Sequence, residues 1–303
     1  MLLCDLTARS RSVTQMRREW LHPSRDPRRD HRRGADEARA LRATIRRTVL
    51  AAATQGRTET AMFEGMERIE FEHEGTLLRG YAARPAGTES SPAVLVMHSA
   101  LGIAHEVNER TARKLAEVGY VAVCTDMYGA HLENPSLEDS GRAFAENRAD
   151  PEKQRARTVA WFDQVASLPD VDDERIAAVG FCYGGMTVLE LARSGANLKA
   201  AVSYHGVLTT HARAEPGVVR GHVVAYCGAG DPYAPREDVE NLHQEMRNAG
   251  VTDYQITVFG AAGHGFTDPD AAALHLDGVR YDALSNEVSW SGTLVLLHHV
   301  FGR

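Results

Sequence analysis

A short glycine-rich segment limits the folds that are open to this chain. Residues 180–185 read Gly-Phe-Cys-Tyr-Gly-Gly; they follow the apolar run 175–179 and precede 186–193, where apolar residues recur with helical spacing. Glycines on both sides of a nucleophilic side chain are typical of a nucleophile elbow, a sharp turn from a buried strand into a helix, because they avoid Cβ clashes. The positive end of that helix faces the sulfur of Cys182 and favours the thiolate. The alternative is a buried, inert cysteine, the usual fate of a free thiol.

Two later segments offer the acid and the base that a thiol nucleophile needs. Asp231 lies in a Gly/Pro turn after the apolar run 222–227, and His264 lies in a glycine-rich loop after the alternating run 254–259. Both residues follow a strand, and functional residues of open parallel sheets gather at that edge. Taken singly, an Asp before Pro is more often a turn former, and a Gly-flanked His is more often an exposed loop residue. The order Cys, Asp, His instead matches the order of nucleophile, acid and histidine in α/β-hydrolases.

These dispersed motifs resemble those of the dienelactone hydrolase family of α/β-hydrolases. The resemblance runs from about Met66 to the C-terminus. It rests on residues 180–185, the turn at Asp231, residues 263–266, and the early segments 94–99 and 119–129.

The resemblance implies roles for individual residues. By that resemblance Cys182, Asp231 and His264 form a catalytic triad. The oxyanion hole consists of the backbone N–H groups of Ala100 and Tyr183, and neither donor requires a particular side chain.

One position departs from the family pattern. Family members commonly carry a glutamate after the first core strand, which holds the resting thiol and exchanges its proton when substrate arrives; the matching position here is Ser99. Serine cannot act as that base. Besides Ser99 itself, His98, His105 and Glu106 are candidates for thiol tuning or substrate contact. Equally, His98 can line the strand end, and His105 and Glu106 can belong to a solvated helix start. Without a substitute, the thiolate depends on the triad histidine and the helix dipole. The family also uses arginines to hold a substrate carboxylate, and the sequence assigns none here.

Alternating strand and helix patterns predict an α/β-hydrolase fold, a mostly parallel eight-stranded sheet with helices on both faces. The first two strands form an antiparallel hairpin. Residues 131–149 are acidic and lack core periodicity, so they form either a lid or insertion beside the site or a solvated surface helix. The expected strands are Glu67–His73, Leu77–Ala83, Ala93–His98, Tyr120–Thr125, Arg175–Phe181, Lys199–Tyr204, His222–Cys227 and Tyr254–Phe259. The expected helices are Glu106–Val118, Pro151–Ser167, Tyr183–Arg193, Arg236–Ala249 and a stretch within Ser285–Phe301.

The first 61 residues differ from the remainder of the chain. They are rich in arginine, contain no lysine and hold few large apolar side chains, so they cannot build a core. We interpret residues 1–61 as an extension, which is a disordered tail, a targeting or binding arm, or a translated region upstream of a start at Met62 or Met66. Residues 62–303 are long enough for one catalytic domain.

Composition excludes several classes of partner. The net charge of −7 and the pI near 6.1 argue against nucleic acid as a partner of the main domain. No apolar run approaches the roughly 18 residues of a membrane span, and no secretory signal is expected. The four cysteines, at positions 4, 124, 182 and 227, lack the spacing of metal ligands or of a disulfide framework, which fits a reducing cytoplasm.

We therefore predict a cysteine-dependent hydrolase of carboxylic esters or lactones. The thiolate attacks the carbonyl and forms a thioester, backbone N–H groups hold the oxyanion, and the histidine protonates the leaving alkoxide and then activates water. The reaction needs no metal and no organic cofactor; the partner is a small-molecule substrate, and the protein is a monomer or homodimer. The alternative is a non-catalytic or redox-responsive thiol protein on the same fold, which loss of the proton-switching glutamate would favour.

Overall fold

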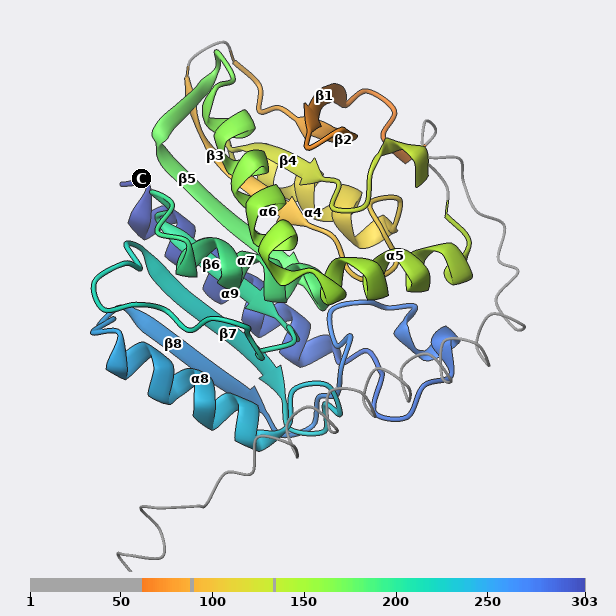
Figure 1. Ribbon diagram of the computed structural model, residues 1–303, viewed down its shortest axis with the longest axis vertical. Coiled ribbons are helices and arrows are strands. Elements are labelled where there is room, and N and C mark those ends of the chain that lie inside the picture. The colour runs from red at the N-terminus through yellow and green to blue at the C-terminus, as the bar shows by residue number, and fades with distance from the viewer. Residues whose placement is uncertain (1–61, 88–89, 133–134, 303) are drawn as a thin grey trace, which may run out of the picture. The chain divides into compact units, whose positions relative to one another are not determined.

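The computed structural model describes residues 62–87, 90–132 and 135–302. Its centre is an eight-stranded sheet with the strand order β1-β2-β4-β3-β5-β6-β7-β8 (Figure 1). The prediction for residues 1–61 lies outside the described residues. The strands are β1 (Glu67–His73), β2 (Thr76–Ala83), β3 (Ser91–Met97), β4 (Val121–Thr125), β5 (Val171–Phe181), β6 (Ala200–Tyr204), β7 (His222–Gly228) and β8 (Tyr254–Phe259).

The pairing of the strands confirms the predicted mostly parallel sheet. β1 and β2 form the predicted antiparallel hairpin, and β2 also pairs antiparallel with β4. All pairings from β4 through β8 are parallel. The hairpin turns at Glu74 and Gly75, whose φ angles of 48° and 71° lie in the left-handed region that glycine adopts without strain. Because parallel strands share one direction, their carboxyl ends meet at a single edge of the sheet.

Helices cover both faces of the sheet. The helices are α4 (Glu106–Glu117), α5 (Leu137–Ala149), α6 (Pro151–Ala166), α7 (Tyr183–Arg193), α8 (Arg236–Asn248) and α9 (Ala283–Val300), with short 3₁₀ turns η1 (Ala130–Leu132) and η2 (Ala271–Leu274). Residues of α4 and α9 share one buried cluster with alternate residues of the central strands. In Figure 1, α6 and α7 lie on the opposite face, in front of β5. The helices therefore confirm the predicted α/β architecture. Among the described residues, no helix is both long enough and apolar enough to cross a membrane.

Close backbone contacts fix the start of α7 against the sheet. A Cβ atom on Gly184 would lie 2.0 Å from the carbonyl oxygen of Met97 at the end of β3. A Cβ atom on Gly180 would lie 2.1 Å from the carbonyl oxygen of Gly184. No real Cβ atom tolerates such distances, so both positions require glycine. The strand-to-helix turn at 180–185 therefore takes the predicted form.

The segment after β4 packs beside this turn. Helix α5 buries Ser140, Ala143 and Phe144 rather than lying free in solvent. The ring of Phe144 meets the ring of Tyr183 edge-on, with centroids 5.3 Å apart. The hydroxyl of Ser140 donates to the carbonyl oxygen of Leu101 at 3.2 Å. Of the two predictions for 131–149, the structure favours an insertion beside the site, and its movement as a lid stays a prediction.

Candidate active site

Cys182 lies at the carboxyl end of β5, where the chain enters α7. Its backbone has φ 55° and ψ −110°, which is strained for a residue other than glycine and costs about 1–3 kcal/mol. Two hydrogen bonds hold this conformation: the Cys182 N–H donates to the Tyr204 carbonyl oxygen at 3.0 Å, and the Cys182 carbonyl accepts from the Met186 N–H at 3.2 Å. The side chain is half-buried. The turn therefore presents the sulfur above the strand end.

His264 and Asp231 lie together in the loops that follow β8 and β7. Their side chains are buried, with Nδ1 of His264 2.9 Å from Oδ2 of Asp231. The other carboxylate oxygen of Asp231 accepts from the Tyr233 N–H at 2.8 Å. The backbone of His264 is fixed on both sides, because its N–H donates to Gly278 O and its carbonyl accepts from Arg280 N–H. The carboxylate thus orients the ring through Nδ1, which leaves Nε2 for the thiol.

The thiol and the imidazole change each other's protonation. Burial alone would raise the pKa of Cys182, but the charge of His264, a hydrogen bond from it, and hydrogen bonds from two backbone N–H groups together lower the pKa. Burial likewise would lower the pKa of His264, but the Cys182 thiolate and the Asp231 carboxylate raise it to about 10. Both shifts favour the same charged state. The two shifts therefore both act in favour of a thiolate–imidazolium pair.

The backbone N–H groups of Ala100 and Tyr183 converge on the same sulfur. Hydrogen bonds from both groups contribute to the lowered pKa of Cys182. The loop that carries Ala100 is held in place, since the carbonyl oxygen of Ala100 accepts a hydrogen bond from the Tyr128 hydroxyl at 3.1 Å. Within the loop, the Leu101 N–H donates to Oγ of Ser99 at 3.3 Å. The two N–H groups predicted as oxyanion donors are therefore brought together beside the nucleophile candidate.

The remaining sequence candidates have other partners. His98 is fully buried; its Nδ1 lies 2.6 Å from the Ser99 carbonyl oxygen, and its Nε2 accepts from the Met127 N–H at 3.0 Å. Burial lowers the pKa of His98, so the ring stays neutral and has no free nitrogen for the thiol. His105 pairs instead with Asp268, with 3.4 Å between Nε2 and Oδ2. Glu106 is exposed in the first turn of α4. None of His98, His105 and Glu106 is among the causes of the lowered pKa of Cys182.

Two residues that sequence analysis missed lie against the His264 ring. His205 follows β6, with its ring centroid 5.0 Å from that of His264, and its Nε2 lies 2.9 Å from Oγ1 of Thr267. Tyr233 meets the His264 ring edge-on, with ring centroids 4.8 Å apart. Both residues follow parallel strands at the same sheet edge as Asp231. The strand-end rule that located Asp231 therefore also gave a signal for these two.

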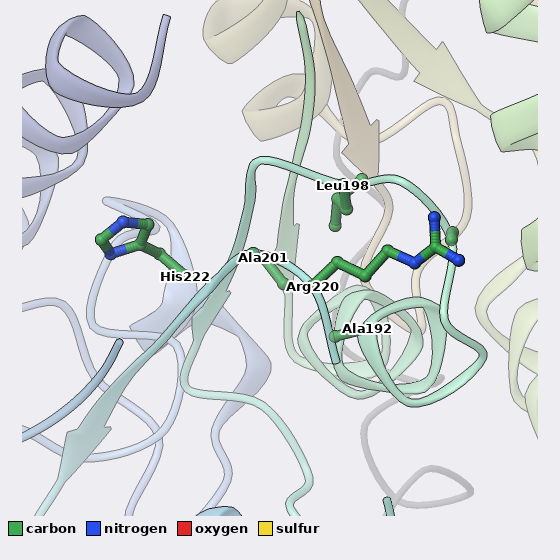
Figure 2. Close-up of a pocket in the computed structure, with 7 residues that line it drawn as sticks. Ala192, Leu198, Ala201, Arg220 and His222 are labelled. Atoms are coloured by element: carbon green, nitrogen blue, oxygen red, sulfur yellow. The ribbon is translucent and has the colours of Figure 1, made fainter. Parts of the chain in front are cut away.

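A separate hollow lies at the opposite edge of the sheet (Figure 2). Leu198 precedes β6, His222 begins β7, and Ala192 lies near the end of α7, so the hollow faces the amino ends of these strands. It contains no nucleophile beside a base. Among the described residues, no group of three or more His, Cys, Asp or Glu side chains is placed to hold a metal ion.

Comparisons with known proteins give relatives over most of this domain. The sequence model of the dienelactone hydrolase family matches residues 78–301. A relative from Synechocystis sp., with the provisional name carboxymethylenebutenolidase, is 28% identical over 207 residues, which are 62% of this chain and 81% of the relative.

Two solved structures are similar over nearly their whole length. The protein m3DLH is 34% identical with a TM-score of 0.73, and the match covers 78% of this chain and 98% of that one. The dienelactone hydrolase-like promiscuous phosphotriesterase P91, from metagenomic libraries, is 32% identical with the same TM-score of 0.73 and the same coverage of 78% and 98%.

Proposed function

Because this chain belongs to the dienelactone hydrolase family and is a hydrolase of the ester and lactone class, we propose that Cys182 is its nucleophile. The single observation that carries the proposal is the convergence on one sulfur of a histidine and two backbone N–H groups. Asp231 orients the histidine through the 2.9 Å contact to Nδ1. A buried, inert thiol has a raised pKa, as burial gives Cys124 and Cys227, whereas the pKa of Cys182 is lowered.

The reaction has two steps. The Cys182 thiolate forms a bond to the carbonyl carbon, and the carbonyl electron pair moves to oxygen, where the N–H groups of Ala100 and Tyr183 hold it. As the C–O bond to the leaving group breaks, the His264 imidazolium gives its proton to the departing alkoxide. The product is a thioester on Cys182. Neutral His264 then takes a proton from water, the hydroxide attacks the thioester, and the thiolate leaves with the imidazolium restored.

A thiolate–imidazolium pair would make a proton-switching glutamate unnecessary for nucleophile formation. In this chain the position is Ser99, whose hydroxyl accepts from a backbone N–H of its own loop. The thiolate is already stabilised by His264 and by two N–H donors. These contacts favour a thiolate before substrate binds, as in a Cys–His pair.

The substrate is a carboxylic ester or lactone, and a phosphotriester is a second candidate. The first follows from the family and from the name of the Synechocystis relative. The second is favoured by the name of P91, which is 32% identical and covered over 98% of its length. With a phosphotriester the same thiolate would attack phosphorus, expel an aryloxide that His264 protonates, and leave a phosphorylated Cys182 for water to cleave.

The test compares wild type with Cys182→Ala on 4-nitrophenyl acetate and on a diethyl aryl phosphate. We expect the variant to fold normally and to lose at least about a hundredfold in kcat/KM, because removal of a nucleophile typically costs several orders of magnitude. Rapid acid quench of the wild type, followed by peptide mass measurement, should find the acyl group on Cys182. Hydrolysis within tenfold of wild type in Cys182→Ala would overturn the proposal. Rapid alkylation of Cys182 without turnover of any ester would favour the redox-responsive thiol protein instead.

A further inference from the structure

Tyr233 is held firmly beside the His264 ring, yet no residue of the described part of the chain binds its hydroxyl. Its backbone N–H donates to Oδ1 of Asp231 at 2.8 Å, so it belongs to the loop that carries the acid. Its ring meets the His264 ring edge-on, with centroids 4.8 Å apart and an interplanar angle of 73°. Among the residues that the structure describes, none forms a hydrogen bond with the Tyr233 hydroxyl, and the side chain is only half-buried. A phenol in such a position is available to a bound ligand.

The charge around this hydroxyl keeps it a hydrogen-bond donor. Burial raises the pKa of Tyr233, and the negative charges of Cys182 and Asp231 raise it further. The phenol therefore retains its proton across the working pH range. The Tyr233 phenol is thus within electrostatic range of the charges on both Cys182 and Asp231.

Its position also identifies the side of the substrate that it faces. In the proposed reaction the acyl oxygen is held by the N–H groups of Ala100 and Tyr183, whereas His264 serves the leaving oxygen. Tyr233 packs against the ring of His264, which puts this residue on the leaving-group side. An oxygen that departs there develops negative charge and needs hydrogen-bond donors.

We propose that the Tyr233 hydroxyl donates a hydrogen bond to the leaving-group oxygen of the substrate. The inference rests on the proposed function, because it assumes acyl transfer to Cys182. The bond matters most for basic leaving groups, such as alkyl alcohols and the ring oxygen of a lactone, since these carry the most charge as the C–O bond breaks. Tyr233 therefore extends the substrate range from activated aryl esters to alkyl esters and lactones.

The experiment measures kcat/KM, which reports acylation, for acetate esters of 4-nitrophenol, phenol, trifluoroethanol and ethanol. We expect Tyr233→Phe to lower kcat/KM by less than about twofold for the nitrophenyl ester and by about tenfold for the ethyl ester, the loss expected for one hydrogen bond in the transition state. The matched control is Tyr254→Phe, whose hydroxyl contacts His243 at the amino end of β8, far from this edge. It should match wild type throughout.

A purely structural role would give a different pattern. If Tyr233→Phe lowered all four rates equally, or none of them, the proposal would be overturned. Alkylation of Cys182 by iodoacetamide breaks no bond to an alcohol, so Tyr233→Phe should leave its rate unchanged; a slowed alkylation would assign Tyr233 to the thiolate instead and would also count against the proposal. A failure of the proposed function would be distinguishable from a failure of this inference. In that case Cys182→Ala would still hydrolyse esters, whether or not Tyr233→Phe changed the dependence on the leaving group.

Discussion

The pKa of Cys182 is lowered in a partly buried place because three neighbours compensate for burial. One is the His264 imidazolium, and the other two are the backbone N–H groups of Ala100 and Tyr183. The strained backbone at φ 55° directs the side chain toward all three. Backbone donors are fixed by the fold itself, whereas the imidazolium can be titrated or removed. The reactivity of the thiol should therefore follow the state of His264.

We expect the rate of Cys182 alkylation by iodoacetamide to stay high at neutral pH. The pKa of Cys182 is lowered, so the thiolate is lost only when the pH falls below the range of an ordinary cysteine, near 8.5. The pKa of His264 is raised to about 10, so the imidazolium persists through the neutral range, and its loss above that value leaves the thiolate in place. The measurement is the alkylation rate from pH 4 to pH 10.5, read by intact mass.

Two variants test the cause of that profile. His264→Ala removes the charge that lowers the pKa of Cys182, so alkylation at pH 7 should slow by about tenfold or more. His105→Ala is the control, because His105 pairs with Asp268 and is not among the causes of the Cys182 shift. Equal profiles for wild type and His264→Ala would contradict the ion pair, and a slowed His105→Ala would restore His105 as a thiol-tuning group.

A carboxylate at position 99 should make the thiolate form of Cys182 less stable. Ser99 precedes Ala100, whose N–H donates to the sulfur, so Ser99→Glu places a negative charge close to Cys182. Like charges disfavour one another, and we expect the pKa of Cys182 to rise, with slower alkylation at neutral pH. Ser99→Ala, which adds no charge, should change the profile far less. An unchanged profile in Ser99→Glu would show that position 99 does not face the sulfur.

At the scale of elements, the site depends on how closely α7 approaches β3. Gly184→Ala would place a Cβ atom 2.0 Å from the Met97 carbonyl oxygen, and backbone cannot move aside as a flexible side chain does. We expect a loss of at least about 3 kcal/mol in the free energy of unfolding, measured by urea denaturation. Displacement of α7 would also separate Tyr183 from Ala100, so kcat should fall in any protein that still folds.

Gly260→Ala is the matched control for that change. A Cβ atom at Gly260 has no heavy atom within 4 Å, and the residue does not need a left-handed backbone. Its free energy of unfolding should stay within about 0.5 kcal/mol of wild type. A Gly184→Ala protein as stable as Gly260→Ala would mean that α7 and β3 are not in the contact described.

Sequence periodicity predicted most elements because each has a uniform pattern of burial. The prediction of α7 as Tyr183–Arg193 is confirmed to the residue. The prediction for β5 was wrong at its start, because this strand begins at Val171 rather than Arg175. Residues 172–175 are polar and lie where the pairing with β3 shifts register, so they lack the apolar alternation that marks a strand.

The candidate site was predictable to a similar extent. Each residue of the proposed triad follows a strand and carries a recognisable side chain, so its position could be read from local sequence. The environment of His98 could not be read from local sequence, because its ring is fixed by the N–H of Met127, which is 29 positions away in the chain. Contacts of that kind depend on strand order, here the pairing of β3 with β4. Local sequence does not contain that information.

At the scale of the whole molecule, the catalytic domain should be independent of residues 1–61. The sequence of that segment has few large apolar side chains and offers little surface to bury. A protein that begins at Met62 should therefore keep its specific activity, and its melting temperature should stay within about 2 °C of that of the full chain, as measured by calorimetry. A large fall in melting temperature would mean that the arginine-rich segment stabilises the acidic domain by charge.

The boundary itself can be located by a second truncation. Phe63 is 2% exposed, and its ring stacks on Tyr81 of β2 with centroids 4.2 Å apart. A protein that begins at Met66 lacks this ring and also the buried Met62, so we expect it to lose about 2–3 kcal/mol of stability, less than a fully central phenylalanine because the ring lies near a chain end. That loss corresponds to several degrees in melting temperature for a domain of this size. Phe63→Ala in the protein that begins at Met62 should reproduce most of this loss of stability. If the two truncations melted together, Phe63 would not belong to the core, and the domain would begin at Met66.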